Sequence, residues 1–183
     1  MFVIHFVGDI HQPLHDSTNT DRGGNCVPVK FFKKKPKLTN RAKGSYSPNL
    51  HGIWDTEMPE RIGSMPSGPN HDQSVQAFAD QLSQDFANDI AAWKSSPIDL
   101  EQWAWDSHQL AVDTSYGKLP KTIPLETPQP ISTCTDNNNI SKRMRKLNEK
   151  VGQAYVDAAS PVIRQQLAKA GTRLAMVLNQ IWP

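Results

Sequence analysis

The sequence contains no apolar run long enough to cross a lipid bilayer, which excludes a membrane-spanning helix. Its apolar opening, MFVIHFV, is too short for the hydrophobic core of a signal peptide, and neither a basic segment nor a small-residue cleavage site accompanies it. Internal repeats are also missing. A chain of 183 residues with 37% hydrophobic and 21% charged residues therefore indicates one globular domain over residues 1–183.

Net charge and cysteine are both scarce. The formal net charge of +2 is too small to argue for a nucleic-acid partner. The basic run KFFKKKPK at 30–37, continued by Arg41 and Lys43, is either a solvated loop or hairpin tip or a surface that attracts phosphate groups. The two cysteines, Cys26 and Cys134, can pair in an oxidising compartment or remain thiols in a reducing one, and the sequence leaves both states open.

Apolar residues at helical spacing predict an all-α, mostly helical domain. A first helix is expected over residues 2–14, where Pro13 should end or bend it. Turn-forming residues predict one irregular arm or short hairpin over residues 16–48, in which VPVKFF forms a short strand or an irregular segment. A second short helix is expected to begin near Asn49, and residues 57–69, rich in Pro, Gly and Ser, are expected to form a connector.

Longer helices are predicted in the second half of the chain. One apolar face recurs over residues 75–93, and Asp99 is a suitable N-cap for the segment LEQWAWDSHQLAVDTSY. After a proline-rich linker over 119–130, residues 140–159 are expected to be helical, and Ser160-Pro161 favours the start of a separate last helix. The buried stripe of that helix is expected to contain Ile163, Leu167, Ala170, Leu174, Val177 and Ile181. Three tryptophans are expected in the core rather than as base-stacking platforms: Trp103, Trp105 and Trp182.

Three of the six histidines lie in the eleven-residue stretch HFVGDIHQPLH, which begins at His5. His5 and Asp9 are four residues apart and so project from one face of a helix, and His51 and Asp55 in HGIWD repeat that spacing. Together with His15 they offer the nitrogen and oxygen ligands that zinc accepts. Each residue alone could be structural, such as a core histidine bonded to a carbonyl. Burying several ionisable groups together is costly, and this favours a metal as their partner.

These residues resemble the S1/P1 nuclease family of zinc-dependent single-strand nucleases. The resemblance is carried by HFVGDIHQPLH, DRGGN at 21–25, NLHGIWD at 49–55, WAWDSHQLA, and AGTRLAMVLNQIW at 170–182. It implies an all-α fold with three zinc ions in a cleft. It also implies hydrolysis of phosphodiester bonds in single-stranded DNA and RNA, with 3'-nucleotidase activity on nucleotides. The same superfamily includes zinc phospholipases C, so a phosphoesterase acting on lipid phosphate is a weaker alternative.

The resemblance also implies a role for each ligand. His5 corresponds to a ligand of one zinc in a close pair, and Asp9 to the metal-bridging carboxylate of that pair, which makes Asp9 the catalytic residue. His11 matches no ligand position and is expected to support a ligand or to pack in the core. A third, separate zinc site is complete in this chain and consists of His15, His51 and Asp55.

The chain departs from the family pattern at its start. Intact members supply further ligands of the close metal pair before the HFVGD motif, whereas four residues precede His5 here. An N-terminally truncated domain with one complete zinc site is therefore expected, and the main alternative to a nuclease is a catalytically inactive zinc-binding remnant. Intact members of the family are secreted or periplasmic, whereas no signal peptide is visible in this chain.

Overall fold

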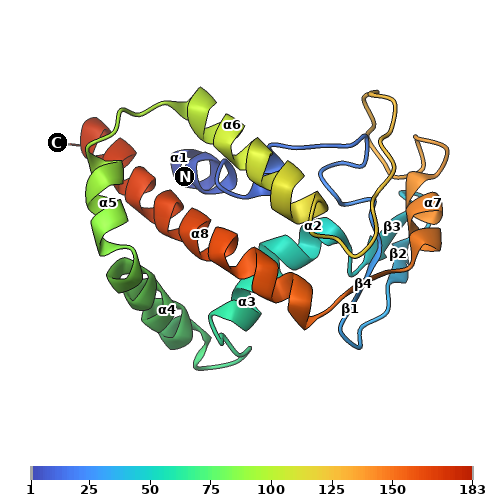
Figure 1. Cartoon of the computed structure of the whole chain (residues 1–183), viewed down its shortest axis with the longest axis horizontal. Coiled ribbons are helices and arrows are strands. Elements are labelled where there is room, and N and C mark those ends of the chain that lie inside the picture. The colour runs from blue at the N-terminus through green and yellow to red at the C-terminus, as the bar shows by residue number, and fades with distance from the viewer. Residues whose placement is uncertain (1, 183) are drawn as a thin grey trace.

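The computed structural model describes residues 2–182 and is mostly helical, as the sequence predicts (Figure 1). The helices are α1 (Phe2–Asp9), α2 (Leu50–Gly52), α3 (Met58–Ile62), α4 (His71–Asp85), α5 (Ala87–Lys94), α6 (Leu100–Leu110), α7 (Ile140–Leu147) and α8 (Gln153–Ile181). Short helical turns are η1 (Pro13–His15, 3-10), η2 (Ile53–Glu57, π) and η3 (Ala111–Tyr116, π). The strands are β1 (Val29–Phe31), β2 (Lys37–Asn40), β3 (Ser45–Ser47) and β4 (Glu149–Val151).

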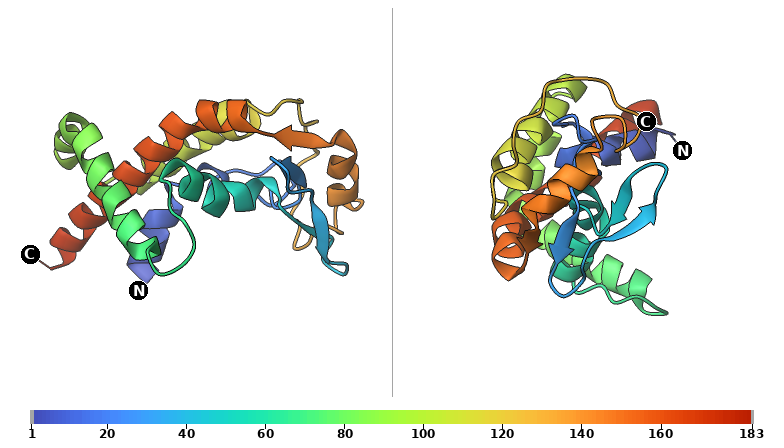
Figure 2. Two further views of the ribbon diagram at one scale, coloured as in Figure 1. Left: turned by 90° about the horizontal axis from the view of Figure 1, so that it is seen from below. Right: turned by 90° about the vertical axis from the view of Figure 1, so that its right-hand side faces the viewer.

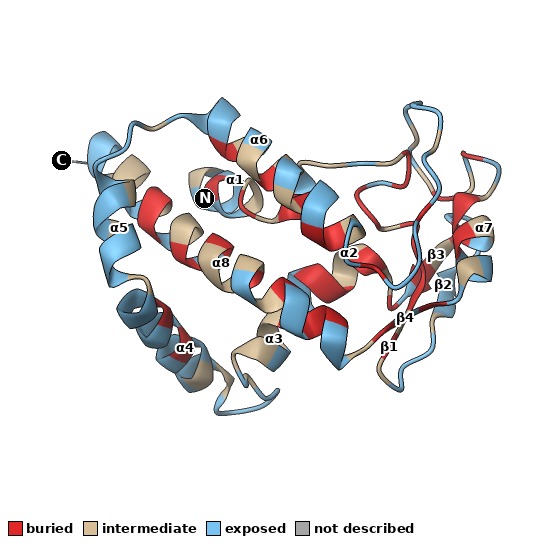
Figure 3. Ribbon diagram, viewed as in Figure 1, coloured by how far each residue is buried: buried red, intermediate tan, exposed pale blue. Residues whose placement is uncertain are grey.

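Helix α8 runs the length of the helical part and contacts α1, α3, α4 and α5 along its course (Figures 1 and 2). Helix α6 lies on the same side of α8 as α1, whereas α3, α4 and α5 lie on the other (Figure 1). The main core gathers around α2, η2 and the first turns of α8, where Leu50, Ile53 and Ala159 are fully buried (Figure 3). Among residues 2–182, no helix is both long and apolar enough to span a membrane.

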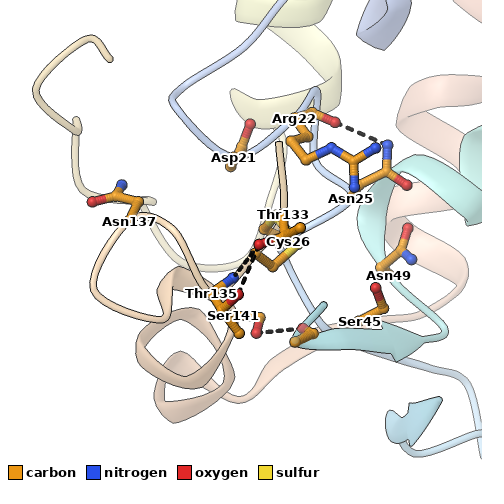
Figure 4. The surroundings of a disulfide bond; sticks show 12 residues. Asp21, Arg22, Asn25, Cys26, Ser45, Asn49, Thr133, Thr135, Asn137 and Ser141 are labelled. Atoms are coloured by element: carbon orange, nitrogen blue, oxygen red, sulfur yellow. Dashed lines mark hydrogen bonds between the residues drawn. A yellow bond between two sulfur atoms is a disulfide. The ribbon is translucent and has the colours of Figure 1, made fainter. Parts of the chain in front are cut away.

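The strands and α7 gather at one end of the molecule (Figure 1). Strands β2 and β3 form an antiparallel hairpin, which confirms the hairpin predicted within residues 16–48. Strand β1 pairs in parallel with β4, so that Val29 lies opposite Glu149. A disulfide between Cys26 and Cys134 resolves the question that the sequence leaves open, and it joins the start of the arm to the loop before α7 (Figure 4).

Several predicted segments differ from the structure. The helix predicted over 140–159 is interrupted, because Asn148 adopts a left-handed conformation and residues 149–151 leave the helix to hydrogen-bond with β1. Pro161 lies inside α8 and does not start a new helix. Its missing N–H removes one hydrogen bond to the carbonyl of Asp157, a residue that is itself exposed to water. In the predicted connector, residues 58–62 form α3, which packs against α8.

The apolar face predicted over 75–93 is divided between α4 and α5, because the chain leaves helical geometry at Phe86. The buried stripe predicted for α8 is only partly confirmed: Ile163 is buried and Ala170, Leu174 and Val177 are partly buried, whereas Leu167 is 40% exposed and Ile181 is 48% exposed. The buried positions of that part of α8 are Gln166, Ala168, Thr172 and Arg173. Trp103 is buried as expected, but Trp105 and Trp182 are 58% and 69% exposed and are not core residues.

Two of the buried polar residues of α8, Gln166 and Arg173, contact His11, which is itself only 3% exposed. Its Nδ1 lies 2.7 Å from the carbonyl oxygen of Val7, and its Nε2 lies 2.9 Å from the guanidinium of Arg173. The amide of Gln166 donates to the carbonyl oxygen of His11 at 3.0 Å. His11 thus packs in the core between α1 and α8, which agrees with the packing role expected for it.

The stability of the fold is expected to fall below neutral pH because of His11. Burial lowers its pKa from 6.5 to about 4. Between these two values the unfolded chain binds a proton that the folded chain does not, so stability is lost as the pH falls. We expect the free energy of unfolding to drop by about 2 kcal/mol through this group between pH 7 and pH 4.5. Urea unfolding in EDTA at both pH values checks this: His11→Gln should show a shallower pH dependence, and an unchanged dependence would contradict the prediction.

Candidate metal centre

Three of the five predicted ligands converge at one place. The Nε2 atom of His15 lies 3.2 Å from one carboxylate oxygen of Asp55, and the Nε2 atom of His51 lies 3.2 Å from the other. The two imidazole rings are stacked, with centroids 4.9 Å apart and planes 11° from parallel. One ligand atom from each residue lies within 4.8 Å of the others. The three side chains are thus arranged around a single point that a metal ion can fill.

Local structure explains how residues from distant parts of the sequence reach this point. Pro13 follows the end of α1 and starts η1, whose last residue is His15. The side chain of Asn49 caps α2 by accepting a hydrogen bond from the N–H of Gly52 at 2.8 Å, which fixes the helical turn that carries His51. Asp55 follows in η2, a π-helical turn of a kind that is frequent at functional sites.

The orientation of His51 is set by the DRGGN motif. Its Nδ1 lies 2.8 Å from the carbonyl oxygen of Gly23, so an N–H at this position donates to that carbonyl and leaves Nε2 free to bind a metal. Gly23 has a φ of +58°, and a Cβ there would lie 2.2 Å from the carbonyl oxygen of Leu14. No other residue fits this position without displacing the chain, which gives the motif a direct role in the site.

The carboxylate of Asp55 is held by three side chains. Besides the two histidines, the amide of Gln12 donates to it at 2.8 Å. Partial burial opposes the charged form of Asp55, but hydrogen bonds from His15, His51 and Gln12 outweigh it and lower the pKa of Asp55 well below its ordinary value. The hydrogen bond between His15 and Asp55 in turn raises the pKa of His15. An ionised carboxylate between two imidazoles is a suitable ligand set for a divalent cation.

The other two predicted ligands lie next to this cluster but do not complete a second one. Asp9 at the end of α1 is 3.0 Å from Nε2 of His5 through one oxygen and 3.5 Å from Nδ1 of His15 through the other. The side chain of His5 is 68% exposed on α1. Among residues 2–182, only His15, His51 and Asp55 form a group of three ligands. Asp9 therefore connects His5 with the three-residue cluster.

Two cavities meet at the cluster. One, of about 390 Å³, is lined by Asp9, His15 and Asp55 together with apolar residues of α8. The other, of about 950 Å³, is lined by Asp9, His15 and His51 and extends past Arg22. The cluster thus faces open space on two sides, so a substrate can approach it.

Three contributors to the site were not assigned a role from the sequence. Gln12 contacts Asp55, which lies 43 residues further along the chain. Gly23 contacts His51 through its backbone carbonyl oxygen, which has no side-chain signature in a sequence. Asp16 lines the larger cavity, and its Oδ2 is buried without a hydrogen-bond partner. Burial raises the pKa of Asp16 to about 6. Its position directly after a candidate ligand in HFVGDIHQPLHD is the only hint that the sequence offers.

A mostly helical domain with a His/His/Asp cluster at an open cleft defines a candidate metal-binding protein. The family model described as S1/P1 nuclease matches residues 1–183, and the chain belongs to that family. It is 27% identical to "Endonuclease 4" of Arabidopsis thaliana over 100% of this chain and 50% of the relative. It is 29% identical to "Nuclease S1" of Aspergillus oryzae over 98% of this chain and 53% of the relative. It is 28% identical to "Nuclease P1" of Penicillium citrinum over 98% of this chain and 56% of the relative. The chain spans about half the length of these curated relatives.

Proposed function

We propose that this chain takes part in zinc-dependent hydrolysis of phosphodiester bonds in single-stranded nucleic acids. The observation that carries the proposal is the convergence of His15, His51 and Asp55 at an open cleft in a chain whose relatives are named nucleases. Two imidazole nitrogens and one carboxylate oxygen would hold a zinc ion and leave room for water or a phosphate oxygen beside it. When bound, zinc supplies charge neutralisation for phosphate and lowers the pKa of bound water.

The residues of the chain prepare this site in distinct ways. Gly23 fixes the ring of His51 through its carbonyl oxygen, and Gln12 steadies the carboxylate of Asp55. Asp9 contacts both His5 and His15. We assign Asp9 the metal-bridging role and His5 the role of a ligand in a neighbouring metal position. These two roles rest on the family resemblance and on the contacts of Asp9.

One observation favours a second candidate function, zinc binding without hydrolysis. His5 and Asp9 form a pair, and no third ligand joins them within residues 2–182. Hydrolysis, the first candidate function, requires further ligands besides His5 and Asp9 to complete the neighbouring metal position. In the second, it stays incomplete, and the chain binds zinc only through His15, His51 and Asp55.

Incubation of the chain with a 5'-labelled single-stranded oligodeoxynucleotide separates the two candidates. We expect zinc-supplemented protein to cleave the oligonucleotide and EDTA-treated protein to leave it intact, with restoration by added zinc. A duplex of the same sequence serves as the control for strand preference. No cleavage, together with about one zinc per chain in metal analysis, would support zinc binding alone. No cleavage and no retained zinc would reject both candidates.

A further inference from the structure

Positive charge is concentrated at the end of the molecule that carries the strands and α7. Twelve of the twenty lysines and arginines lie in residues 30–43 and 142–150. The single acidic residue in these segments is Glu149, which is only 1% exposed. The remaining segments hold eight basic and seventeen acidic residues. The net charge of +2 therefore hides two regions of opposite charge.

The two basic segments form one continuous surface. Strand β1 pairs with β4, and Lys30 lies opposite Lys150. The guanidinium of Arg145 lies over the ring of Tyr46 in β3, 5.4 Å from its centroid. The hydroxyl of Ser141 in α7 donates to the carbonyl oxygen of Gly44 at 2.6 Å, beside the disulfide (Figure 4). We call this surface the basic end; its exposed cations are Lys33, Lys34, Lys35, Lys37, Arg41, Lys43, Lys142, Arg145, Lys146 and Lys150.

The fold does not neutralise this charge. In the part of the chain that the structure describes, none of the ten exposed cations forms an ion pair; Arg143, which pairs with Glu126 at 2.6 Å, is not among them. Lys30 and Lys150 face each other across the β1–β4 pair, where like charges are destabilising. Self-repulsion of this kind opposes folding, and a bound polyanion would relieve it.

The basic end is continuous with the metal centre. Strand β3 ends at Ser47, two residues before Asn49, which caps the helix that carries His51. Between the two regions lie Arg22 and Asn25, which line the larger cavity together with His15 and His51. The cavity is also lined by residues 129–131, and a few residues further along the N–H of Cys134 donates to the carbonyl oxygen of Lys43 in the basic end, so this side of the metal centre leads toward the basic end.

We propose that the basic end binds the sugar-phosphate backbone of a single-stranded nucleic acid whose cleaved bond lies at the metal centre. The inference rests on the proposed function and adds a second, sequence-independent contact to it. Anionic lipid is the other polyanion with suitable charge. The apolar side of α7, formed by Ile140 and Met144, is buried in the fold and leaves no apolar face to enter a bilayer. Nucleic acid is therefore the better match.

The test is the salt dependence of binding to a fluorescein-labelled 20-nucleotide oligothymidylate, measured by anisotropy in EDTA so that no cleavage occurs. Lys35→Gln/Lys146→Gln removes two exposed charges of the basic end. We expect the slope of log Kd against log salt to fall by about 1.4, since each lost contact with a single-strand phosphate contributes about 0.7. The ratio of the two affinities should therefore shrink by about 7-fold between 50 mM and 200 mM salt, because a slope difference of about 1.4 acts over a fourfold rise in salt. The matched control, Lys94→Gln/Lys169→Gln, removes two charges near the opposite end of the molecule and should leave the slope unchanged.

The outcomes separate this inference from the proposed function, because binding in EDTA needs neither zinc nor cleavage. If the chain proves inactive, a reduced slope for the basic-end variant alone still supports the surface. If the chain is active, the variant should raise KM for the 20-nucleotide strand and leave a dinucleotide substrate unaffected. Equal slopes for the two double variants would overturn the inference. The inference would also be overturned if the native chain bound vesicles that contain phosphatidylglycerol but did not bind the oligonucleotide.

Discussion

Replacing Asp55 with asparagine is expected to weaken zinc binding by at least about 100-fold, because the variant loses the only carboxylate of the three-residue cluster. Both oxygens of Asp55 face imidazole nitrogens at 3.2 Å, so Asp55 is the residue that links the two histidines. The amide of asparagine offers one neutral oxygen and turns an N–H₂ group toward the second histidine. Isothermal titration with zinc measures the loss directly.

The same variant should lose the thermal stabilisation that we expect zinc to give the native chain. A ligand that binds only the folded state stabilises it by about 2.7 kcal/mol at a concentration one hundred times its Kd. We therefore expect the melting temperature of the native chain to rise with zinc and that of Asp55→Asn to stay constant at the same zinc concentration. In EDTA the variant should melt somewhat below the native chain, because it loses an ionised carboxylate that His15, His51 and Gln12 stabilise, so the shift caused by zinc in each protein is the quantity to compare.

Two controls separate loss of a ligand from general damage. Asp89→Asn makes the same chemical change at an exposed position of α5 and should leave zinc affinity unchanged. His108→Ala removes a histidine that lines the larger cavity but bonds to the Asp16 carbonyl at 3.1 Å instead of joining the cluster. If His108→Ala lowered zinc affinity as much as His51→Ala, the assignment of the site would be wrong.

The parts of the structure that were predictable from the sequence depend on local spacing. The pair of His51 and Asp55 could be seen because residues four apart on a helical turn lie side by side, and the π-helical turn preserves that contact. Asp99 was recognisable as an N-cap for the same reason: its carboxylate accepts from the N–H of Gln102, three residues away. That His15 belongs with them came from the family motif, since forty residues separate it from Asp55.

The parts that were not predictable depend on long-range contacts. Residues 149–151 have no strong strand pattern, and they become a strand because β1 offers hydrogen-bonding partners more than a hundred residues earlier in the chain. Likewise, the buried face of α8 is set by Gln166 and Arg173, which hydrogen-bond to His11 from the opposite end of the sequence. An apolar stripe read from α8 alone misses this face, because its residues are polar. Trp105 and Trp182 show the same limit, since hydrophobicity alone does not decide which side of a helix is covered.

Loss of the Cys26–Cys134 disulfide is expected to lower the free energy of unfolding by about 4 kcal/mol. The bond joins residues 108 positions apart, and closing a loop of this length removes much of the conformational freedom of the unfolded chain. Because a domain of this kind is stable by about 5–15 kcal/mol in total, this one bond supplies a large share. The corresponding fall in melting temperature is about 8–16 °C.

The chain should still fold without the disulfide, because other contacts hold the same loops in place. The loop around Cys134 is also held by backbone and side-chain hydrogen bonds: the N–H of Cys134 donates to the Lys43 carbonyl at 2.9 Å, and the Thr135 hydroxyl donates to the Ala42 carbonyl at 3.2 Å. Near Cys26, the N–H of His51 donates to the Gly24 carbonyl and keeps the metal centre in place. Cys26→Ser/Cys134→Ser should therefore fold and bind zinc at low temperature while unfolding at lower denaturant concentration.

Guanidinium unfolding of the native chain with and without a phosphine reductant, beside the double serine variant, provides the measurement. The reduced native chain and the variant should unfold at similar denaturant concentrations, both well below that of the oxidised chain, and the reductant should not affect the variant. A variant that matched the oxidised chain would show that the disulfide adds no stability. A reductant effect on the native chain much smaller than that of the double substitution would point to damage from the two buried serines, since both cysteine side chains are almost completely enclosed. Cys26 and Cys134 both lie before the two basic segments, which are also joined by the β1–β4 pair and by the Ser141–Gly44 hydrogen bond, so loss of the disulfide in the folded chain should leave the salt dependence of oligonucleotide binding unchanged.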